Sequence, residues 1–196
     1  MRRWRPTTIL RLPRMPKRGS LIVTLIVLAL LLALAVIQSS RPVTSTQQIE
    51  GVVSRVYDGD TVEVEGVGKV RLIGVDALDA HNEDKVLRQS HHLGLSEAAV
   101  KGWANKATAL ARELILGKQV RLESGPERKD DYGRTLAYVY FRSHESEVQL
   151  NRLLLEEGLA TAYKSYPHPY LDEFLHLEEQ ARMLRKGFWM DARPDR

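Results

Sequence analysis

The stretch DGDTVEVEGVGKVRLIGVD, residues 58–76, decides the fold. Between Thr61 and Glu65, β-branched residues alternate with acidic ones, which is typical of a strand with one buried face. Similar runs flank it on both sides, so three strands are expected over Val52–Tyr57, Thr61–Glu65 and Lys69–Val75. Turn sequences separate these runs at 58–59 and 66–68. We therefore predict an antiparallel meander in which Asp60 begins one strand and Asp76 follows the end of another.

Beyond the meander, the pattern predicts helices and two further strands. Residues 80–95 are polar, rich in His and not periodic, so we expect a mobile loop there. Ser96 is a suitable N-cap, and Gly117 a suitable stop, for a helix between them. A charged loop at 125–133 should separate the two remaining strands, Gln119–Glu123 and Thr135–Phe141. Two more helices are predicted at Val148–Glu157 and Tyr170–Lys186, which gives an α+β fold class.

Charge is distributed unevenly along the 196 residues. Eight of the 29 Lys and Arg lie in residues 1–47, which leaves 21 basic against 25 acidic residues in the rest of the chain. Composition therefore does not call for a broad basic face, and phosphate affinity must come from local residues. Cysteine is absent, which excludes disulfides and thiolate metal sites.

The N-terminal part has the composition of a membrane-targeting segment. A basic flank at 1–20 precedes an uncharged apolar run at 21–37, followed by a linker at 38–47. The run can be an uncleaved anchor or a cleaved secretory signal. In both cases the basic flank should stay cytoplasmic, so we expect a membrane-anchored or secreted protein with its C-terminal domain on the non-cytoplasmic side. We expect one domain at 48–190, a tail at 191–196, and a monomer.

Two Asp and two Arg residues carry the chemistry that the sequence suggests. Asp60 and Asp76 offer the hard oxygen ligands that Ca²⁺ takes. Arg71 and Arg134 offer planar forks suited to phosphate oxygens. Arg71 lies in an otherwise apolar strand, so its guanidinium should face a carboxylate or a ligand phosphate. The alternatives are ordinary turn residues for the two Asp, and structural ion pairs for the two Arg.

From about Ile49 to Trp189 the chain resembles the thermonuclease family, of the staphylococcal nuclease type. The matching segments are 58–61, 70–76, 131–138, 158–160 and 187–189. The resemblance implies a five-stranded OB-type β-barrel with three helices, here preceded by one hydrophobic N-terminal helix. It also implies a calcium-dependent nuclease that hydrolyses DNA and RNA without sequence preference and leaves 3′-phosphate ends. The alternative is a binding module for nucleic acid or protein with a degenerate site.

The resemblance assigns roles residue by residue. Asp60, Asp76 and the backbone carbonyl of Ala77 would be the metal ligands, and Arg71 and Arg134 would bind phosphate. The family has Glu at the general-base position, where this chain has the shorter Asp79. The base is therefore Asp79, Glu83 from the following loop, or absent.

Aromatic and acidic residues complete the predicted site. Tyr132, Tyr163 and Tyr166 match tyrosines that surround the nucleotide in the family, although they could equally be rim packing. Asp131 stands where relatives often carry Lys or Arg, so one phosphate contact should be missing. Asp58 is expected to support the turn or the metal ligands. Four of the six histidines, His81, His91, His92 and His168, are interpreted as solvated loop residues.

Overall fold

The computed structural model describes residues 48–193, and the fold is given for these residues. Its strands are β1 (Gln48–Val56), β2 (Thr61–Val64), β3 (Gly68–Leu72), β4 (Val75–Ala77), β5 (Gln119–Lys129), β6 (Thr135–Ser143), β7 (Ser146–Gln149) and β8 (Ala160–Ala162). Its helices are α2 (Glu83–Leu93), α3 (Glu97–Ile115), α4 (Leu150–Glu156), α5 (Leu171–Met183) and the 3₁₀ helix η1 (Gly187–Met190).

Five strands close into a barrel. The sheet order is β3-β2-β1-β5-β6-β7, and an additional pairing of β3 with β6 closes it. The meander is antiparallel, as predicted, with Val56 opposite Val62 and Thr61 opposite Arg71. The closing pair is parallel, with Arg71 opposite Leu136. The five-stranded barrel and the α+β class expected from the sequence are confirmed.

The third predicted strand is interrupted before its expected end. Lys69–Val75 was predicted as one strand, but β3 stops at Leu72 and a separate strand, β4, begins at Val75. Gly74 at the break has φ +74°, and a Cβ there would approach the His168 ring to 2.5 Å. Past the break, β4 leaves the barrel and pairs with β8, so Asp76 faces Thr161. This small sheet was not predicted, because its strands have three residues each.

The prediction of a mobile loop at 80–95 is wrong, because α2 occupies residues 83–93. The side chain of Asn82 caps its start by accepting from the Lys85 N–H at 3.0 Å, and Gly94 ends it with φ +64°. Only Val86 and Leu93 are buried in this helix, so its polar sequence lacks a regular apolar face. The fold therefore has four α-helices rather than three among residues 48–193.

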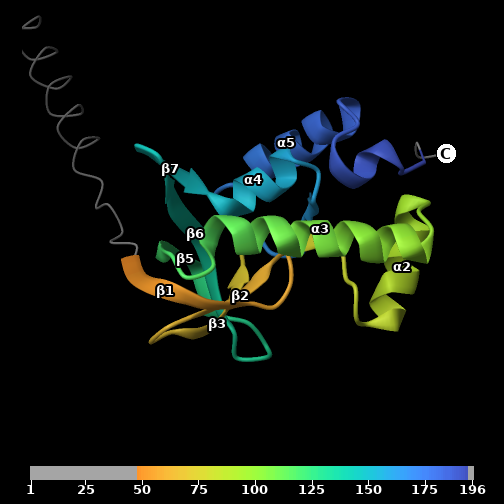
Figure 1. The fold of residues 1–196 in the computed structure, drawn as a ribbon. Coiled ribbons are helices and arrows are strands. Elements are labelled where there is room, and N and C mark those ends of the chain that lie inside the picture. The colour runs from red at the N-terminus through yellow and green to blue at the C-terminus, as the bar shows by residue number, and fades with distance from the viewer. Residues whose placement is uncertain (1–47, 194–196) are drawn as a thin grey trace, which may run out of the picture. The chain divides into compact units, whose positions relative to one another are not determined.

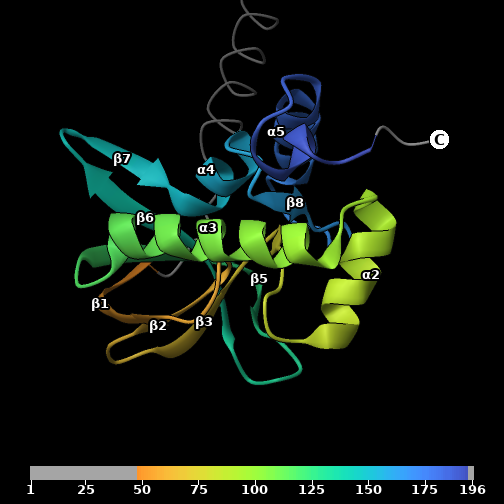
Figure 2. The ribbon, with the colours of Figure 1, turned by 45° about the vertical axis from the view of Figure 1, so that its right-hand side comes forward.

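Helix α3 crosses beside the barrel, with α4 and α5 on one side of it and the β2–β3 hairpin on the other (Figures 1 and 2). The turn at residue 59 packs tightly here, since a Cβ on Gly59 would lie 2.8 Å from those of Ala77 and Ala107. Glycine thus lets the Asp58–Asp60 turn sit directly on α3 and β4. The buried core is mostly aliphatic. Its three largest fully buried side chains are the aromatic residues Tyr138, Phe174 and Phe188.

The structure changes one other prediction, and three more fall outside the described residues. The loop predicted at 125–133 is partly strand, since β5 continues to Lys129. The apolar run at 21–37 lies outside the described residues, as do the basic flank and the linker. Between residues 48 and 193, no helix combines the length and the hydropathy needed to cross a membrane.

Candidate active site

Asp60 is a buried carboxylate fixed by its own turn. The Asp58 carboxylate accepts from the Asp60 N–H at 2.9 Å, which orders the turn. Asp60 is 4% exposed, and its Oδ2 accepts from the Ala77 N–H at 2.7 Å across to β4. Its Oδ1 accepts from the Thr61 hydroxyl at 3.1 Å. Because burial penalises ionisation, the pKa of Asp58 is raised, although the charge of Arg71 counters this.

Arg71 joins the two carboxylates that the sequence predicts as metal ligands. Its Nη1 forms an ion pair with Asp60 Oδ1, and its Nη2 donates to Asp76 Oδ1 at 3.0 Å. The guanidinium points to carboxylates, as expected for an Arg on an apolar strand. Burial lowers the pKa of Arg71, while Asp76 and Asp58 oppose that effect. The turn before β2, strand β3 and strand β4 thus bring Asp60, Arg71 and Asp76 to one point.

Lys85 is a site residue that the sequence did not reveal. From the first turns of α2, its Nζ lies 3.2 Å from Asp76 Oδ1 and 3.8 Å from Asp79 Oδ2. A loop assignment for 80–95 gave no reason to place this lysine, and nothing in the sequence directs it to Asp76. Two cations, Arg71 and Lys85, therefore share one oxygen of Asp76.

Asp79 shapes the entry to α2. Its Oδ1 accepts from the N–H groups of His81 and Asn82 at 2.8 and 2.9 Å, which is an Asx-type turn. Burial alone would raise the pKa of Asp79, but these two hydrogen bonds and the Lys85 charge outweigh it, so the pKa is lowered. A carboxylate with a low pKa is a weaker proton acceptor. Its assignment as general base stays a prediction.

Gln89 on α2 holds the segment that carries Ala77 and Asp79. Its side-chain oxygen accepts from the Asp79 N–H at 2.9 Å, and its side-chain nitrogen donates to the Ala77 carbonyl at 3.3 Å. The amide thus pairs with the backbone as a neighbouring strand would. The other edge of this segment pairs with β8. Glu83, the alternative base, instead binds Lys101 on α3 through both oxygens at 2.9 Å.

Arg134 is oriented by Asp130, which sequence reasoning did not single out. Its Nε donates to Asp130 Oδ2 at 2.6 Å, and its backbone N–H donates to Oδ1 at 2.9 Å. Asp130 also accepts from the Tyr132 N–H at 3.0 Å, so one carboxylate closes the whole turn. Within residues 48–193, no acceptor is hydrogen-bonded to the Nη atoms of Arg134. These atoms are available to an anionic ligand.

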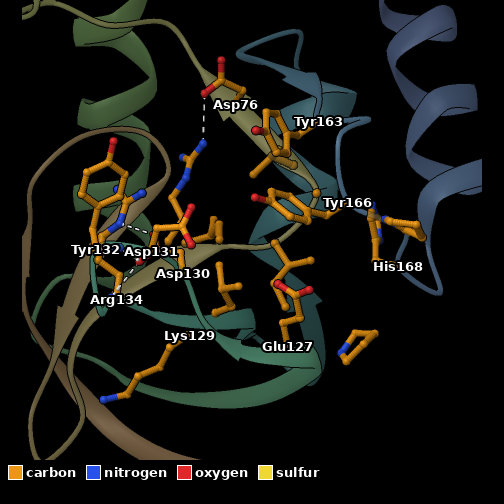
Figure 3. Close-up of a pocket in the computed structure, with 18 residues that line it drawn as sticks. Asp76, Glu127, Lys129, Asp130, Asp131, Tyr132, Arg134, Tyr163, Tyr166 and His168 are labelled. Carbon is orange, nitrogen blue, oxygen red and sulfur yellow. Dashed lines mark hydrogen bonds and ion pairs between the residues drawn. The ribbon is translucent and has the colours of Figure 1, made fainter.

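A cavity of about 430 Å³ lies beside part of this site, and Asp60, Ala77 and Asp79 are not among its lining residues. Arg71, Asp76 and Arg134 line it together with the predicted tyrosines, Tyr132, Tyr163 and Tyr166. Figure 3 shows Tyr163 and Tyr166 on one side of the cavity and the 130–134 turn on the other. The rings of Tyr163 and Tyr166 are 6.0 Å apart, and Tyr132 is 86% exposed. The structure thus gathers these segments around one cavity.

His168 also lines the cavity, contrary to the interpretation of all four histidines as solvated. Its Nδ1 lies 3.0 Å from the Tyr138 hydroxyl, and burial lowers its pKa, so the neutral ring is favoured. His81, His91 and His92 are exposed. No cluster of three or more His, Cys, Asp or Glu that could hold a metal occurs between residues 48 and 193.

The donor set nevertheless suits a hard cation. Asp60 and Asp76 each contact the Arg71 guanidinium through a carboxylate oxygen, so the two carboxylates lie close together. Asp76 is 26% exposed on its side chain, so a cation could reach the pair from the cavity. Two carboxylates supply only part of the six to eight oxygens that Ca²⁺ takes, and water or phosphate oxygens would have to complete them. The Ala77 carbonyl is held by Gln89 rather than free.

Known proteins are similar to this chain over about two thirds of its length. The profile of the family described as "Staphylococcal nuclease homologue" matches residues 69–191. A thermonuclease of Staphylococcus intermedius is 35% identical over 134 residues, covering 67% of this chain and 68% of that protein. A thermonuclease of Staphylococcus hyicus is 32% identical over 141 residues, with 70% and 73% covered. An uncharacterized protein of Methanocaldococcus jannaschii is 34% identical over 147 residues, with 71% and 70% covered.

Proposed function

This chain belongs to the staphylococcal nuclease homologue family, and we propose that it is a calcium-dependent nuclease hydrolysing phosphodiester bonds of DNA and RNA. One observation carries the proposal. Arg71 links Asp60 and Asp76 at the edge of a cavity that also receives Arg134 and three tyrosines. Cationic forks, a carboxylate pair and stacking rings are the groups needed to hold a nucleotide phosphate and its base.

Asp60 and Asp76 would hold the cation, with the Ala77 carbonyl as a third ligand if Gln89 releases it. A bound Ca²⁺ would supply positive charge to the phosphoryl oxygens. The protein contributes the geometry, since Asp60 is fixed from two sides before any ligand binds. Arg71 then has two functions. Its ion pairs neutralise Asp60 and Asp76, and it would bind a phosphate oxygen if a cation took over that neutralisation.

Arg134 binds and orients the phosphate. Asp130 holds Nε and the backbone N–H of Arg134, which lines the cavity, so the two Nη atoms are left to bind a phosphate as a fork. Such a fork stabilises the negative charge that builds on phosphoryl oxygens during an in-line displacement, without having to reorganise. Asp79 is the proposed acceptor of the proton from the attacking water. Its second oxygen is free of the Asx-type turn, although Lys85 lies 3.8 Å away.

The tyrosines account for the proposed lack of sequence preference. Tyr132, Tyr163 and Tyr166 offer ring faces, and every base has a π-face to stack on them. Stacking contributes roughly 1 to 3 kcal/mol per base without reading its edge. Scission on the 5′-oxygen side, leaving 3′-phosphate ends, is proposed from the resemblance.

A non-catalytic binding module is the second candidate, and one observation favours it. One carboxylate oxygen of Asp79 is already hydrogen-bonded in the turn into α2, and the pKa of Asp79 is lowered. General-base effects are worth roughly 10² to 10⁴ in rate, so a poorly placed base would leave binding with little turnover. This module would still use Arg134 and the tyrosines to bind nucleic acid.

Cleavage of single-stranded DNA by the full-length protein, with Ca²⁺ or with a chelator, separates the two candidates. Metal-dependent cleavage that is lost in Asp60→Ala supports the nuclease. The Asp60→Ala protein should also lose Ca²⁺ binding by calorimetry while its circular dichroism is unchanged. Binding of DNA without any cleavage would support the module instead.

Anchoring through residues 21–37 and a monomeric state are proposals from the sequence, to be measured by membrane fractionation and light scattering.

A further inference from the structure

Lys85 brings a positive charge from α2 to the proposed metal ligands. Its Nζ lies 3.2 Å from Asp76 Oδ1 and 3.8 Å from Asp79 Oδ2, so one ammonium group pairs with both carboxylates. Across residues 48–193 it pairs with no other carboxylate. The two acidic residues that precede it on α2 are not its partners, since Glu83 binds a lysine of α3 and Asp84 is exposed.

The fold holds this ammonium group in place. Asn82 caps α2 by accepting from the Lys85 N–H at 3.0 Å, which sets where the helix begins. Gln89, four residues further on, lies on the same face of α2 as Lys85. Its side-chain amide makes two hydrogen bonds, of 3.3 and 2.9 Å, to the backbone of the 76–79 segment. The helix is thereby attached to the segment that its lysine faces.

A divalent cation bound to Asp76 would meet the charge of Lys85. Lys85 and Arg71 both contact Oδ1 of Asp76, at 3.2 and 3.0 Å. A cation that took this oxygen would have to displace the ammonium group, and one that used the other oxygen would still lie beside it. Like charges a few ångströms apart repel, and more strongly where water is partly excluded. The side chains of Lys85 and Asp76 are 28% and 26% exposed, so solvent screens this repulsion incompletely.

We propose that Lys85 is a tethered competitor of the metal, which holds Asp76 in the metal-free protein and weakens the affinity of the site for a divalent cation. This inference rests on the proposed nuclease function, because it takes Asp60 and Asp76 as the metal ligands. It adds a residue that sets how much metal the site needs. A purely structural role, in which Lys85 only holds α2 against the site, predicts a different result. Removing Lys85 would then leave metal binding unchanged or weaken it.

Calorimetric titration of Ca²⁺ into the full-length protein tests the proposal. Lys85→Met keeps most of the aliphatic side chain and removes the charge. It should lower the dissociation constant for Ca²⁺ about tenfold, since a unit charge beside a divalent cation changes affinity by about that factor. Lys85→Arg keeps the charge and should stay within about threefold of the unmodified protein. A dissociation constant in Lys85→Met that equals or exceeds that of the unmodified protein would overturn the proposal.

Lys118→Met is the matched control, because it makes the same substitution far from the site. Lys118 is exposed, and its Nζ donates to the backbone carbonyl of Glu113 at 3.2 Å rather than to a carboxylate. It follows the end of α3, and Figure 2 shows α2 at the other end of that helix. The 19 residues of α3 span about 28 Å, well beyond the Debye length of ~10 Å.

The control separates a local effect from a change in net charge. The dissociation constant of Lys118→Met should differ from that of the unmodified protein by less than about twofold, because its charge is screened from the site. Raising the salt concentration should shrink the effect of Lys85→Met for the same reason. If Lys118→Met tightens Ca²⁺ binding as much as Lys85→Met does, the effect belongs to net charge and the proposal fails.

The inference and the proposed function fail in different measurements. If Lys85→Met tightens Ca²⁺ binding but no protein cleaves single-stranded DNA, the inference holds and the nuclease assignment fails. If the unmodified protein cleaves DNA in Ca²⁺ and the dissociation constants are equal, the nuclease assignment holds and the inference fails. Absence of Ca²⁺ binding in every protein would overturn both. Circular dichroism checks that each variant is folded, and Lys85→Gln, which is polar and uncharged, replaces Lys85→Met if that variant does not fold.

Discussion

Replacing Arg71 by Met should destabilise the metal-free protein through Asp60. Met keeps much of the aliphatic contact of Arg71 but removes its charge and donors. Asp60 is 4% exposed and would be left as a buried carboxylate without its cation, although it keeps the Thr61 and Ala77 hydrogen bonds. Asp76 would keep Lys85 at 3.2 Å. The loss of stability in Arg71→Met therefore comes mainly from the Asp60 carboxylate.

The size of the effect follows from the burial of the pair. Removing one partner of a buried ion pair typically costs 3 to 5 kcal/mol, because the remaining charge is desolvated and unpaired. The Arg71 side chain is 14% exposed, and Asp60 retains two hydrogen-bond donors. We therefore expect a destabilisation at the lower end of this range, about 3 kcal/mol. Urea unfolding in a chelator should show this as a lower midpoint with an unchanged slope.

A double-mutant cycle isolates the pair. The Asp60→Asn change removes the charge that Arg71 neutralises, so Arg71→Met should cost much less in that background, with a coupling energy of about 2 kcal/mol or more. Ca²⁺ should also stabilise Arg71→Met more than the unmodified protein, since it replaces the missing charge. Strict additivity of the two changes, or an Arg71→Met protein of unchanged stability, would refute the reasoning.

Three more changes test other parts of the site. Arg134→Lys should lower turnover by roughly 10² or more with little change in unfolding midpoint, because Lys lacks the bidentate fork; unchanged turnover would show that Arg134 only holds its turn. The pKa of Asp79 is lower in the folded protein than in the unfolded chain, so the ionised carboxylate stabilises the folded state at pH values above the unfolded pKa. This stabilisation is lost as the pH falls through the folded pKa. The stability gap to Asp79→Asn should hence be constant near neutral pH and close below about pH 4, and a gap independent of pH would contradict it. Gln89→Leu removes two hydrogen bonds and should cost about 1 to 2 kcal/mol in unfolding free energy by urea unfolding, whereas the exposed neighbour Arg88→Leu should leave the unfolding midpoint unchanged.

The strands of the barrel could be predicted because their signals are local, whereas their closure into a barrel was implied by the family resemblance. Alternating residues between Thr61 and Glu65, glycine turns and a single capped helix each report on their own segment. Arg71 could be expected to face a carboxylate or a phosphate, because a guanidinium on an apolar strand needs a partner. These features need no knowledge of distant residues.

Helix α2 could not be predicted in this way, and with it Lys85 and Gln89 were missed. Only two of its residues are buried, so no regular apolar face marks it. Its position comes from contacts with the 76–79 segment, which the sequence does not display. The break at Gly74 was missed for a similar reason, since the His168 ring that crowds it lies far along the chain.

The sequence by itself determined the residue types of the site, namely two Asp, two Arg and three Tyr, and the strand that carries Arg71. Only the tertiary structure decided their partners. Arg71 neutralises Asp60 and Asp76, Asp130 orients Arg134, and Asp79 turns the chain into α2. The physical reason is that strand and helix periodicity are set by neighbours in sequence, whereas charge pairing depends on distances of a few ångströms between segments that only the closed barrel brings together.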